Sequence, residues 1–271
     1  MSKPLVWLIG SPGDPCFAPA IDWLAEQFEL RRFDNVAESQ QQSSQPPEPL
    51  YGAVFCSVRP GQFDAAAVEA LHRSEPHARL VLLLGSWCEG EVRSGSVIAG
   101  VKRIYWHQWR GLLPLALGRT PEGEERQPLP RTASEADWLE ATLSDTAPQG
   151  KNLLVAVCTA RAATFDWLAD ALTRGGFHAT WQRPDRPMQI GDAQVIVWDG
   201  WPSDSLRSDD NLARIGQVLL LDFPRPEDRQ RALELGVTEL VSRPCQLITL
   251  WDAVSAAAQR EAPRPSVAEI A

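Results

Sequence analysis

Side chains that can do chemistry gather after short apolar runs in both halves of this 271-residue chain. In the second half, Asp199 directly follows one such run, Asp222 follows another, and Arg243 with Pro244 follows a third. In the first half, four such segments carry thiols, carboxylates, an imidazole, guanidinium groups and indoles. These first-half candidates are Cys16, Ser57, Arg59, Trp87, Cys88, Glu89, Glu91, Arg93, Trp106, His107 and Trp109.

The first-half candidates fit three kinds of chemistry. Cys16, Cys88 and His107 carry ligand atoms for zinc, but no CxxC or HxxxH spacing accompanies them, and we predict no metal. Cys88 and His107 also match the residue types of a nucleophile and its base. The tryptophan faces and arginine donors fit a site for a ligand or a peptide. In the simplest alternative, the tryptophans close this edge of the domain and the charged side chains pair among themselves.

Motifs that mark nucleotide-binding or acyl-transfer enzymes are missing from the sequence. There is no GxxxxGK followed by Ser or Thr, no GxGxxG at a strand–helix junction and no GxSxG. The loop at residues 9–13 has few glycines for a phosphate cradle, and Pro12 removes an amide donor. We therefore predict a protein that is not an enzyme and has no cofactor.

Apolar runs alternate with segments of helical spacing along the chain, and the order occurs twice. Residues 5–33 and 153–181 both predict a strand, a loop, a helix containing Asp-Trp-Leu-Ala, and a second strand. Later runs at 53–56 and 81–84 correspond to those at 195–198 and 218–221. This pattern predicts an α/β fold of two flavodoxin-like, doubly wound domains, each a five-stranded parallel sheet with helices on both faces. Right-handed crossovers place the candidate residues along one edge of each sheet.

Composition sets the expected domain limits. We expect a first domain over residues 1–119, a linker over 120–149 with a short helix around 135–143, a second domain over 150–262 and a flexible tail over 263–271. Residues 37–49 are rich in Gln, Ser and Pro, and we expect them to be unstructured.

Residues 227–244, which read EDRQRALELGVTELVSRP, resemble part of the response-regulator receiver (CheY-like) domain. In that family a helix ends in Ala-Leu-x-x-Gly, a short strand follows, and a Lys-Pro step leads into the last helix, which here would span 247–257. The resemblance extends over residues 151–258 through the order and spacing of five strand–helix units. In the first half it is limited to topology, and residue types there exclude receiver phosphorylation.

The resemblance implies a specific chemistry at the edge of the second sheet. Receivers use an acidic pair that holds Mg²⁺, an aspartate that takes the phosphoryl group, a Ser or Thr, and a Lys, because several negative oxygens must be neutralised together. By this comparison, the phosphoacceptor position is Asp199, the Ser or Thr position is Asp222, and the Lys position is Arg243, followed by Pro244.

The same comparison shows where this chain departs from the family. The acidic-pair positions fall on Thr159 and Ala160, so no second carboxylate holds Mg²⁺ there. Arginine favours a standing bidentate pair with a carboxylate, and we expect Asp199 to form a fixed ion pair with Arg243 or Arg161.

Charge and cysteine usage narrow the class of protein. The net charge of −9 argues against nucleic acid and anionic membranes as partners. The apolar stretch at residues 5–10 is too short for a signal peptide, and five scattered cysteines indicate reduced thiols, so we expect a cytoplasmic protein.

These observations favour a non-enzymatic signalling adaptor or scaffold of tandem pseudo-receiver domains that acts by binding a protein partner. We expect an exposed face on the last helix, through which a homodimer can form; its residues would be Leu247, Leu250, Trp251 and Val254. The first alternative is a receiver phosphorylated at Asp199 in a two-component phosphorelay. The second is a small-molecule or metal-binding domain at the first-half crevice.

Overall fold

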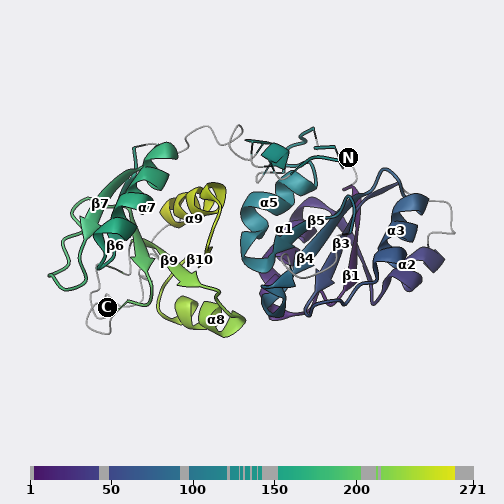
Figure 1. The fold of residues 1–271 in the computed structure, drawn as a ribbon, viewed down its shortest axis with the longest axis horizontal. Coiled ribbons are helices and arrows are strands. Elements are labelled where there is room, and N and C mark those ends of the chain that lie inside the picture. The colour runs from purple at the N-terminus through teal and green to yellow at the C-terminus, as the bar shows by residue number, and fades with distance from the viewer. Residues whose placement is uncertain are drawn as a thin grey trace, which may run out of the picture. The chain divides into compact units, whose positions relative to one another are not determined.

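The chain forms two compact units, which we describe separately. In the computed structural model, the described residues are 3–42, 49–91, 98–120, 123–127, 129–130, 132–134, 136–138, 140–141, 152–202, 212 and 215–259. The first unit spans Met1–Thr142 and the second spans Leu143–Ala271. Each has the α/β organisation that the sequence predicts (Figure 1).

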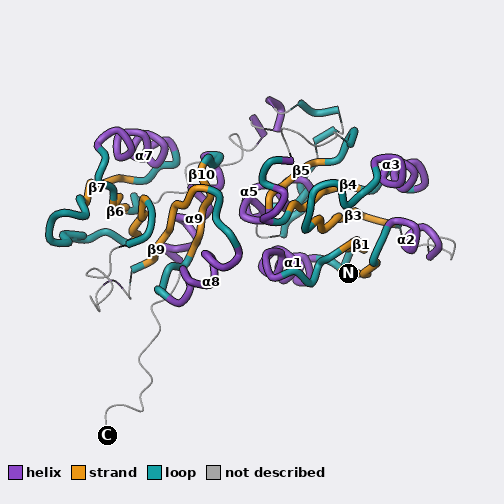
Figure 2. Tube along the Cα trace, turned by 60° about the horizontal axis from the view of Figure 1, so that its bottom comes forward, coloured by secondary structure: helices purple, strands orange, loops and turns teal. Residues whose placement is uncertain are grey.

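The first unit is built on a parallel sheet in the order β2-β1-β3-β4-β5. Its strands are β1 (Leu5–Gly10), β2 (Glu29–Phe33), β3 (Leu50–Ser57), β4 (Arg79–Leu84) and β5 (Lys102–Tyr105). Helices α1 (Ala18–Gln27) and α5 (Trp109–Ala116) cover one face, and α2 (Val36–Gln42) and α3 (Ala65–Ser74) cover the other (Figures 1 and 2). Three short 3-10 turns, η1 (Pro15–Phe17), η2 (Ser86–Cys88) and η3 (Trp106–Gln108), follow strand ends at its carboxyl edge.

The second unit repeats the same strand order, β10-β9-β8-β6-β7. Its strands are β6 (Leu154–Cys158), β7 (His178–Gln182), β8 (Val195–Asp199), β9 (Gly216–Asp222) and β10 (Glu239–Arg243). Its helices are α7 (Ala162–Arg174), α8 (Pro226–Glu234) and α9 (Leu247–Gln259). Side chains of α7 and α9 pack on one face of the sheet and Ala232 of α8 packs on the other. The predicted fold of two flavodoxin-like parallel sheets is therefore confirmed.

Uniformly apolar strands explain why both sheets are covered on both faces. Successive residues of a strand point to opposite faces. Leu5, Trp7 and Ile9 of β1 share a buried cluster with Val68 and Leu71 of α3, and the strand's other apolar residues face the opposite layer. In the central strands, polar side chains consequently lie near the strand ends, where the loops emerge.

The prediction that residues 37–49 are unstructured is wrong for residues 37–42, which belong to α2. Asn35 caps this helix by accepting a hydrogen bond from the Glu38 N–H at 2.9 Å, and the Glu38 carboxylate accepts one from the Asp34 N–H at 2.8 Å. Val36 and Ser39 are buried against the unit. Local capping and one apolar anchor outweigh the polar composition here. Residues 43–48 lie outside the described part of the chain.

Much of the expected linker contacts the first unit where the structure describes it. Arg119 and Glu125 form an isolated antiparallel bridge, and the Arg126 guanidinium donates to the Ala141 carbonyl at 3.3 Å. The Lys102 ammonium lies 4.6 Å from the centre of the Trp138 ring. Residues 136–138 and 140–141 are helical, within the expected short helix, whereas the expected tail at 263–271 lies outside the described residues.

The expected exposed face of the last helix is wrong. Leu250, Trp251 and Val254 of α9 lie in the buried cluster of the second unit, and Leu247 packs against its margin. The Trp251 indole N–H donates to the Ala171 carbonyl of α7 at 2.8 Å. The apolar side of a helix that lies beside a sheet packs into the core, which is why these residues are buried rather than exposed. Among the described helices, none has the length and apolar character needed to cross a membrane.

Candidate functional site

The carboxyl edge of the first sheet is closed by its own side chains. Trp106 is only 1% exposed and Trp109 is buried against Trp23, with ring centroids 6.3 Å apart. Cys16, Cys88 and Ser57 are buried as well. A binding surface of three tryptophans is therefore wrong for Trp106 and Trp109, and only Trp87, 81% exposed, presents an indole to solvent.

Charged residues of this edge pair among themselves and fix the loop after β4. His107 Nε2 lies 3.2 Å from a carboxylate oxygen of Glu89, and the Tyr105 hydroxyl donates to the Glu89 carbonyl at 2.8 Å. The Tyr105 and His107 rings stack with centroids 5.7 Å apart. Glu91 accepts a hydrogen bond from the Gly61 N–H at 3.3 Å. This matches the simplest of the sequence-based alternatives. Arg59 is exposed, and Arg93 lies outside the described residues.

Neither zinc binding nor a nucleophile–base pair is supported at this edge. Cys88 Sγ lies 3.5 Å from the Ser57 carbonyl, while His107 pairs with Glu89. Burial raises the pKa of Cys88 to about 11 and also raises that of Cys16, which disfavours the thiolate that either chemistry needs. Within the described part of the chain, no group of three or more His, Cys, Asp or Glu side chains is placed to hold a metal ion.

The edge of the second sheet carries a connected network centred on Asp199. Arg243 Nη1 donates to Asp199 Oδ1, and the Thr159 hydroxyl donates to Asp199 Oδ2 at 2.7 Å. Arg243 Nε also lies 3.0 Å from Asp222 Oδ1. The predicted ion pair of Asp199 with Arg243 is confirmed, and both carboxylate oxygens of Asp199 are engaged. The peptide bond between Arg243 and Pro244 is cis.

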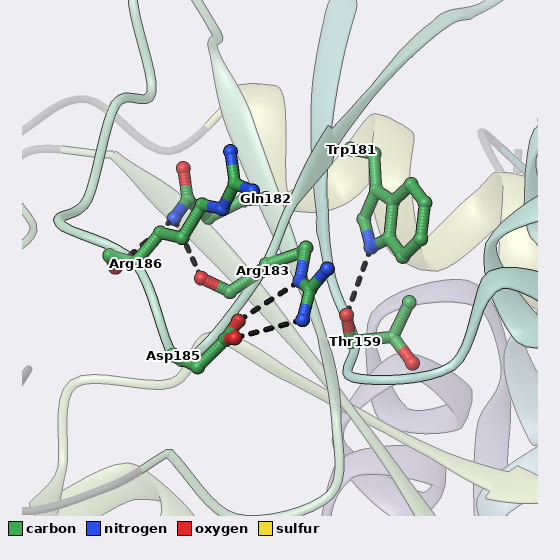
Figure 3. Close-up of polar contacts among 6 residues, drawn as sticks. All are labelled: Thr159, Trp181, Gln182, Arg183, Asp185 and Arg186. Atoms are coloured by element: carbon green, nitrogen blue, oxygen red, sulfur yellow. Dashed lines mark hydrogen bonds and ion pairs between the residues drawn. The ribbon is translucent and has the colours of Figure 1, made fainter.

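Thr159 is positioned by hydrogen bonds to its backbone carbonyl and to its side-chain hydroxyl. The Trp181 indole N–H donates to the Thr159 carbonyl at 2.8 Å (Figure 3). The Arg161 N–H donates to the Thr159 hydroxyl at 3.2 Å. Trp181 stacks on Phe165 with ring centroids 5.3 Å apart. The sequence comparison placed Thr159 only as a missing carboxylate. Apart from the residue type, nothing in the sequence indicated that the Thr159 hydroxyl donates a hydrogen bond to Asp199.

The loop between β7 and β8 forms a rigid wall beside this network. Gln182 Nε2 donates to the carbonyls of Arg183 at 2.9 Å and Pro187 at 3.2 Å, and Gln182 Oε1 accepts from the Gln189 N–H at 2.9 Å. The Arg183 guanidinium forms a two-pronged pair with Asp185 at 2.9 and 2.7 Å, as Figure 3 shows. These bonds fix the loop that contains Pro184.

A cavity of about 440 Å³ lies over the network. Strand ends, loops and the start of α7 line it, through Cys158, Thr159, Ala160, Arg161, Pro184, Trp198, Asp199, Gly200, Trp201, Pro202, Asp222 and Arg243. The sequence prediction included Asp199, Asp222 and Arg243 in this set but missed the tryptophans. Trp198 stands in an apolar run that is typical of a buried strand, and Trp201 follows three residues later. Among the described residues, the two sheets therefore differ at the same edge: buried tryptophans and thiols occupy it in the first unit, and a cavity lies there in the second.

Among the solved structures that are similar to this chain, two are described as two-component system response regulator/GGDEF domain proteins. One is 12% identical, with 95% of this chain and 100% of that chain covered at a TM-score of 0.36. The other is 13% identical, with 94% and 98% covered at a TM-score of 0.35. No family model matches the chain, and no curated protein matches it. At this level of similarity, the function has to be inferred from the geometry of the site.

Proposed function

We propose that this protein is a non-enzymatic signalling adaptor made of two receiver-like units, in which the second unit does not accept a phosphoryl group. The observation that carries the proposal is the state of Asp199. One of its oxygens is paired with the Arg243 guanidinium and the other accepts the Thr159 hydroxyl. A carboxylate that is hydrogen-bonded on both oxygens, once by a guanidinium, is a weaker nucleophile for a phosphorus centre, because these contacts stabilise its negative charge.

The surroundings of Asp199 also disfavour a divalent cation. Mg²⁺ demands several oxygen ligands in near-octahedral geometry, and carboxylates are its usual protein ligands. Thr159 and Ala160 supply no carboxylate where a receiver has its acidic pair. A fixed guanidinium beside Asp199 repels the cation electrostatically. Without Mg²⁺, charge on the transferring phosphoryl group would be left unneutralised.

Phosphorylation can be tested directly by intact-mass spectrometry after incubation with acetyl phosphate and Mg²⁺. We expect no phosphoryl adduct on the wild-type chain, under conditions that label a competent receiver run in parallel. A stoichiometric adduct that disappears in Asp199→Asn would overturn the proposal.

One observation favours the alternative of a phosphorylated receiver. Asp222 lies within reach of the same guanidinium, so two carboxylates face each other across Arg243. If Arg243 swung away, these carboxylates would offer oxygen ligands to a cation. Arg243→Lys tests this possibility, because a lysine keeps the charge but cannot bridge two carboxylates in a planar fork. The alternative would be supported if acetyl phosphate and Mg²⁺ gave a phosphoryl adduct on both the wild-type chain and Arg243→Lys.

The adaptor role needs a surface for a protein partner, and we propose Trp87 as its anchor. The indole is exposed, while the flanking backbone is fixed: Cys88 N–H donates to the Gly85 carbonyl at 2.9 Å, and Glu89 is held by His107 and Tyr105. A rigid exposed tryptophan loses little conformational entropy when a partner covers it. Proteins that co-purify with the wild-type chain should be lost with Trp87→Ala and kept with Trp167→Ala, a matched exposed indole on the second unit.

A further inference from the structure

The Asp199 network lines one part of the cavity in the second unit and does not fill it. Its volume of about 440 Å³ lies within the range of small-molecule sites in proteins, which is roughly 300–1,000 Å³. The Asp199 network forms one part of the lining, and the rest consists of Cys158, Ala160, Arg161, Gly200, two tryptophans and two prolines. Most of the exposed lining is polar, so this cavity offers charged and polar groups for recognition beside a smaller apolar surface.

Charge is distributed unevenly along the cavity. Asp199 is neutralised by Arg243 and Thr159. Arg161 lines the cavity at the N-cap of α7, its side chain is exposed, and among the described residues its guanidinium has no partner. Asp222 ends β9, two strand positions from β6, which corresponds to about 10 Å across the sheet. Asp222 and Asp199 share the one guanidinium of Arg243, so this end of the cavity keeps one negative charge in excess. The cavity thus has a positive end at Arg161 and a negative end at Asp222.

Trp201, which is half-buried, and Pro184, which is exposed, present apolar surface to the cavity, whereas Trp198 and Pro202 are buried behind it. The Arg231 guanidinium lies 4.5 Å from the centre of the Trp201 ring, which fixes the ring from one side. The buried Trp198 indole N–H donates to Gln217 Oε1 at 2.9 Å, and Gln217 in turn donates to the Leu212 carbonyl at 3.0 Å. Pro184 belongs to the wall loop that Gln182 fixes. Preorganised aromatic and proline surfaces favour a planar ligand, because little ordering is needed on binding.

We propose that this cavity binds a planar organic anion, meaning a ring system that carries a carboxylate or a phosphate. The anionic group lies at the Arg161 end, where the guanidinium and the positive end of the α7 dipole both attract it. The ring lies against Trp201 and the prolines, away from Asp222. This inference concerns the second unit alone and is independent of the partner surface at Trp87, so either can fail without the other.

Two anionic probes and their uncharged counterparts test the proposal on the full chain. The probes are 1-naphthoate with 1-naphthalenemethanol, and adenosine monophosphate with adenosine. Binding is followed through the indole N–H signals in ¹H–¹⁵N spectra, with Trp201→Phe used to assign one of them. We expect at least one anion to shift the Trp198 and Trp201 signals saturably with a Kd below about 1 mM, and its uncharged counterpart to bind at least about tenfold more weakly. Naphthoate alone would indicate a carboxylate ligand, and the nucleotide alone a phosphate ligand.

Arg161→Gln supplies the decisive variant, and Arg174→Gln its control on the same helix. Arg174 pairs with Asp170 at the far end of α7 and does not line the cavity. We expect Arg161→Gln to weaken the anion at least about tenfold, as loss of a charged hydrogen bond does, and Arg174→Gln to leave it unchanged. Four results would overturn the proposal: no probe shifts the two indoles, the uncharged compounds bind equally well, Arg161→Gln has no effect, or inorganic phosphate displaces the probe at equal concentration.

Discussion

The two units have the same strand order and use the same edge in opposite ways. In the first, Trp106, Trp109 and buried thiols occupy the described part of the carboxyl edge, and His107 lies 3.2 Å from the Glu89 carboxylate in the loop above it. In the second, the edge holds the Asp199 network and a cavity of about 440 Å³. A shared topology therefore decides where polar side chains gather, whereas residue types decide whether that place is filled or open.

A second contrast comes from the repeated Asp-Trp-Leu-Ala sequence in the first helix of each unit. Trp23 of α1 is 8% exposed and packs against Phe28 and Trp109. Trp167 of α7, at the corresponding place, is 45% exposed. The first unit supplies an aromatic partner from the start of α5, while the second turns Trp251 of α9 toward the Ala171 carbonyl instead. The tryptophan of this repeat is thus core in one unit and surface in the other, whereas Leu24 and Leu168 are buried in both.

The largest expected change in the free energy of unfolding comes from replacing the tryptophan of this repeated sequence in each unit. Trp23→Ala should lower the free energy of unfolding of the first unit by about 3–5 kcal/mol, because it leaves a large cavity in a packed cluster. Trp167→Ala should change that of the second unit by less than about 1 kcal/mol, because its indole is half exposed. Denaturant titrations of the full chain measure both. Equal losses in the two variants would remove the distinction between core and surface.

The Asp199 network should give the next largest effect. Arg243→Ala leaves a largely buried carboxylate facing Thr159 alone and should destabilise the second unit by about 2–3 kcal/mol, less than the roughly 3–5 kcal/mol of a fully buried pair. The double variant Asp199→Asn with Arg243→Ala should recover part of the loss, because no carboxylate is stranded. Asp222→Asn, at a position 70% exposed, should cost less than about 1 kcal/mol. Thermal or denaturant melts in which Arg243→Ala is neutral would show that the pair contributes nothing.

Buried thiols should make stability depend on pH in both units. Burial raises the pKa of Cys56 in the first unit to about 12 and that of Cys158 in the second to about 12, from an ordinary value of 9.0. A raised folded-state pKa means that the stabilising contribution is complete below pH 9.0 and is lost as the pH rises toward 12. The loss amounts to about 1 kcal/mol per pH unit for each thiol.

Comparison with Cys56→Ala and Cys158→Ala isolates the contribution of each thiol, since other groups also titrate at high pH. Each variant should lose less stability than the wild-type chain between pH values of about 8 and 10.5, as measured by urea titrations. Parallel curves for the wild-type chain and the variants would contradict the prediction.

The smallest expected effect is at the exposed end of the first-unit edge. Trp87→Ala should change the melting temperature little, within about 0.5 kcal/mol, because the indole has few contacts to lose. Trp106→Ala is the matched opposite, since that ring is fully buried a short distance along the same edge. A strong destabilisation by Trp87→Ala would show that this indole is structural and would remove it as a partner anchor.

The amino-acid sequence by itself determined the strands, their parallel arrangement and the place where the candidate residues meet. Apolar runs of strand length alternating with helical segments carry that information locally, and crossover handedness supplies the rest. It also determined that Asp199 and Arg243 stand at strand ends along the same edge of one sheet, because each follows a strand-forming segment of the second half. Residues 37–42 were missed because capping by Asn35 is a weaker signal than their polar composition.

Only the tertiary structure decided which side chains are covered and which are paired. Thr159 and Asp199 are 40 residues apart in the chain, and Asp199 and Arg243 are 44 apart. No local sequence pattern therefore indicates that Thr159 and Arg243 both contact the Asp199 carboxylate. Burial of Trp106, exposure of Trp87 and the cavity beside Arg161 likewise depend on segments that are distant in the chain. Periodicity reports the direction in which a side chain points, whereas its partner depends on which other elements pack there.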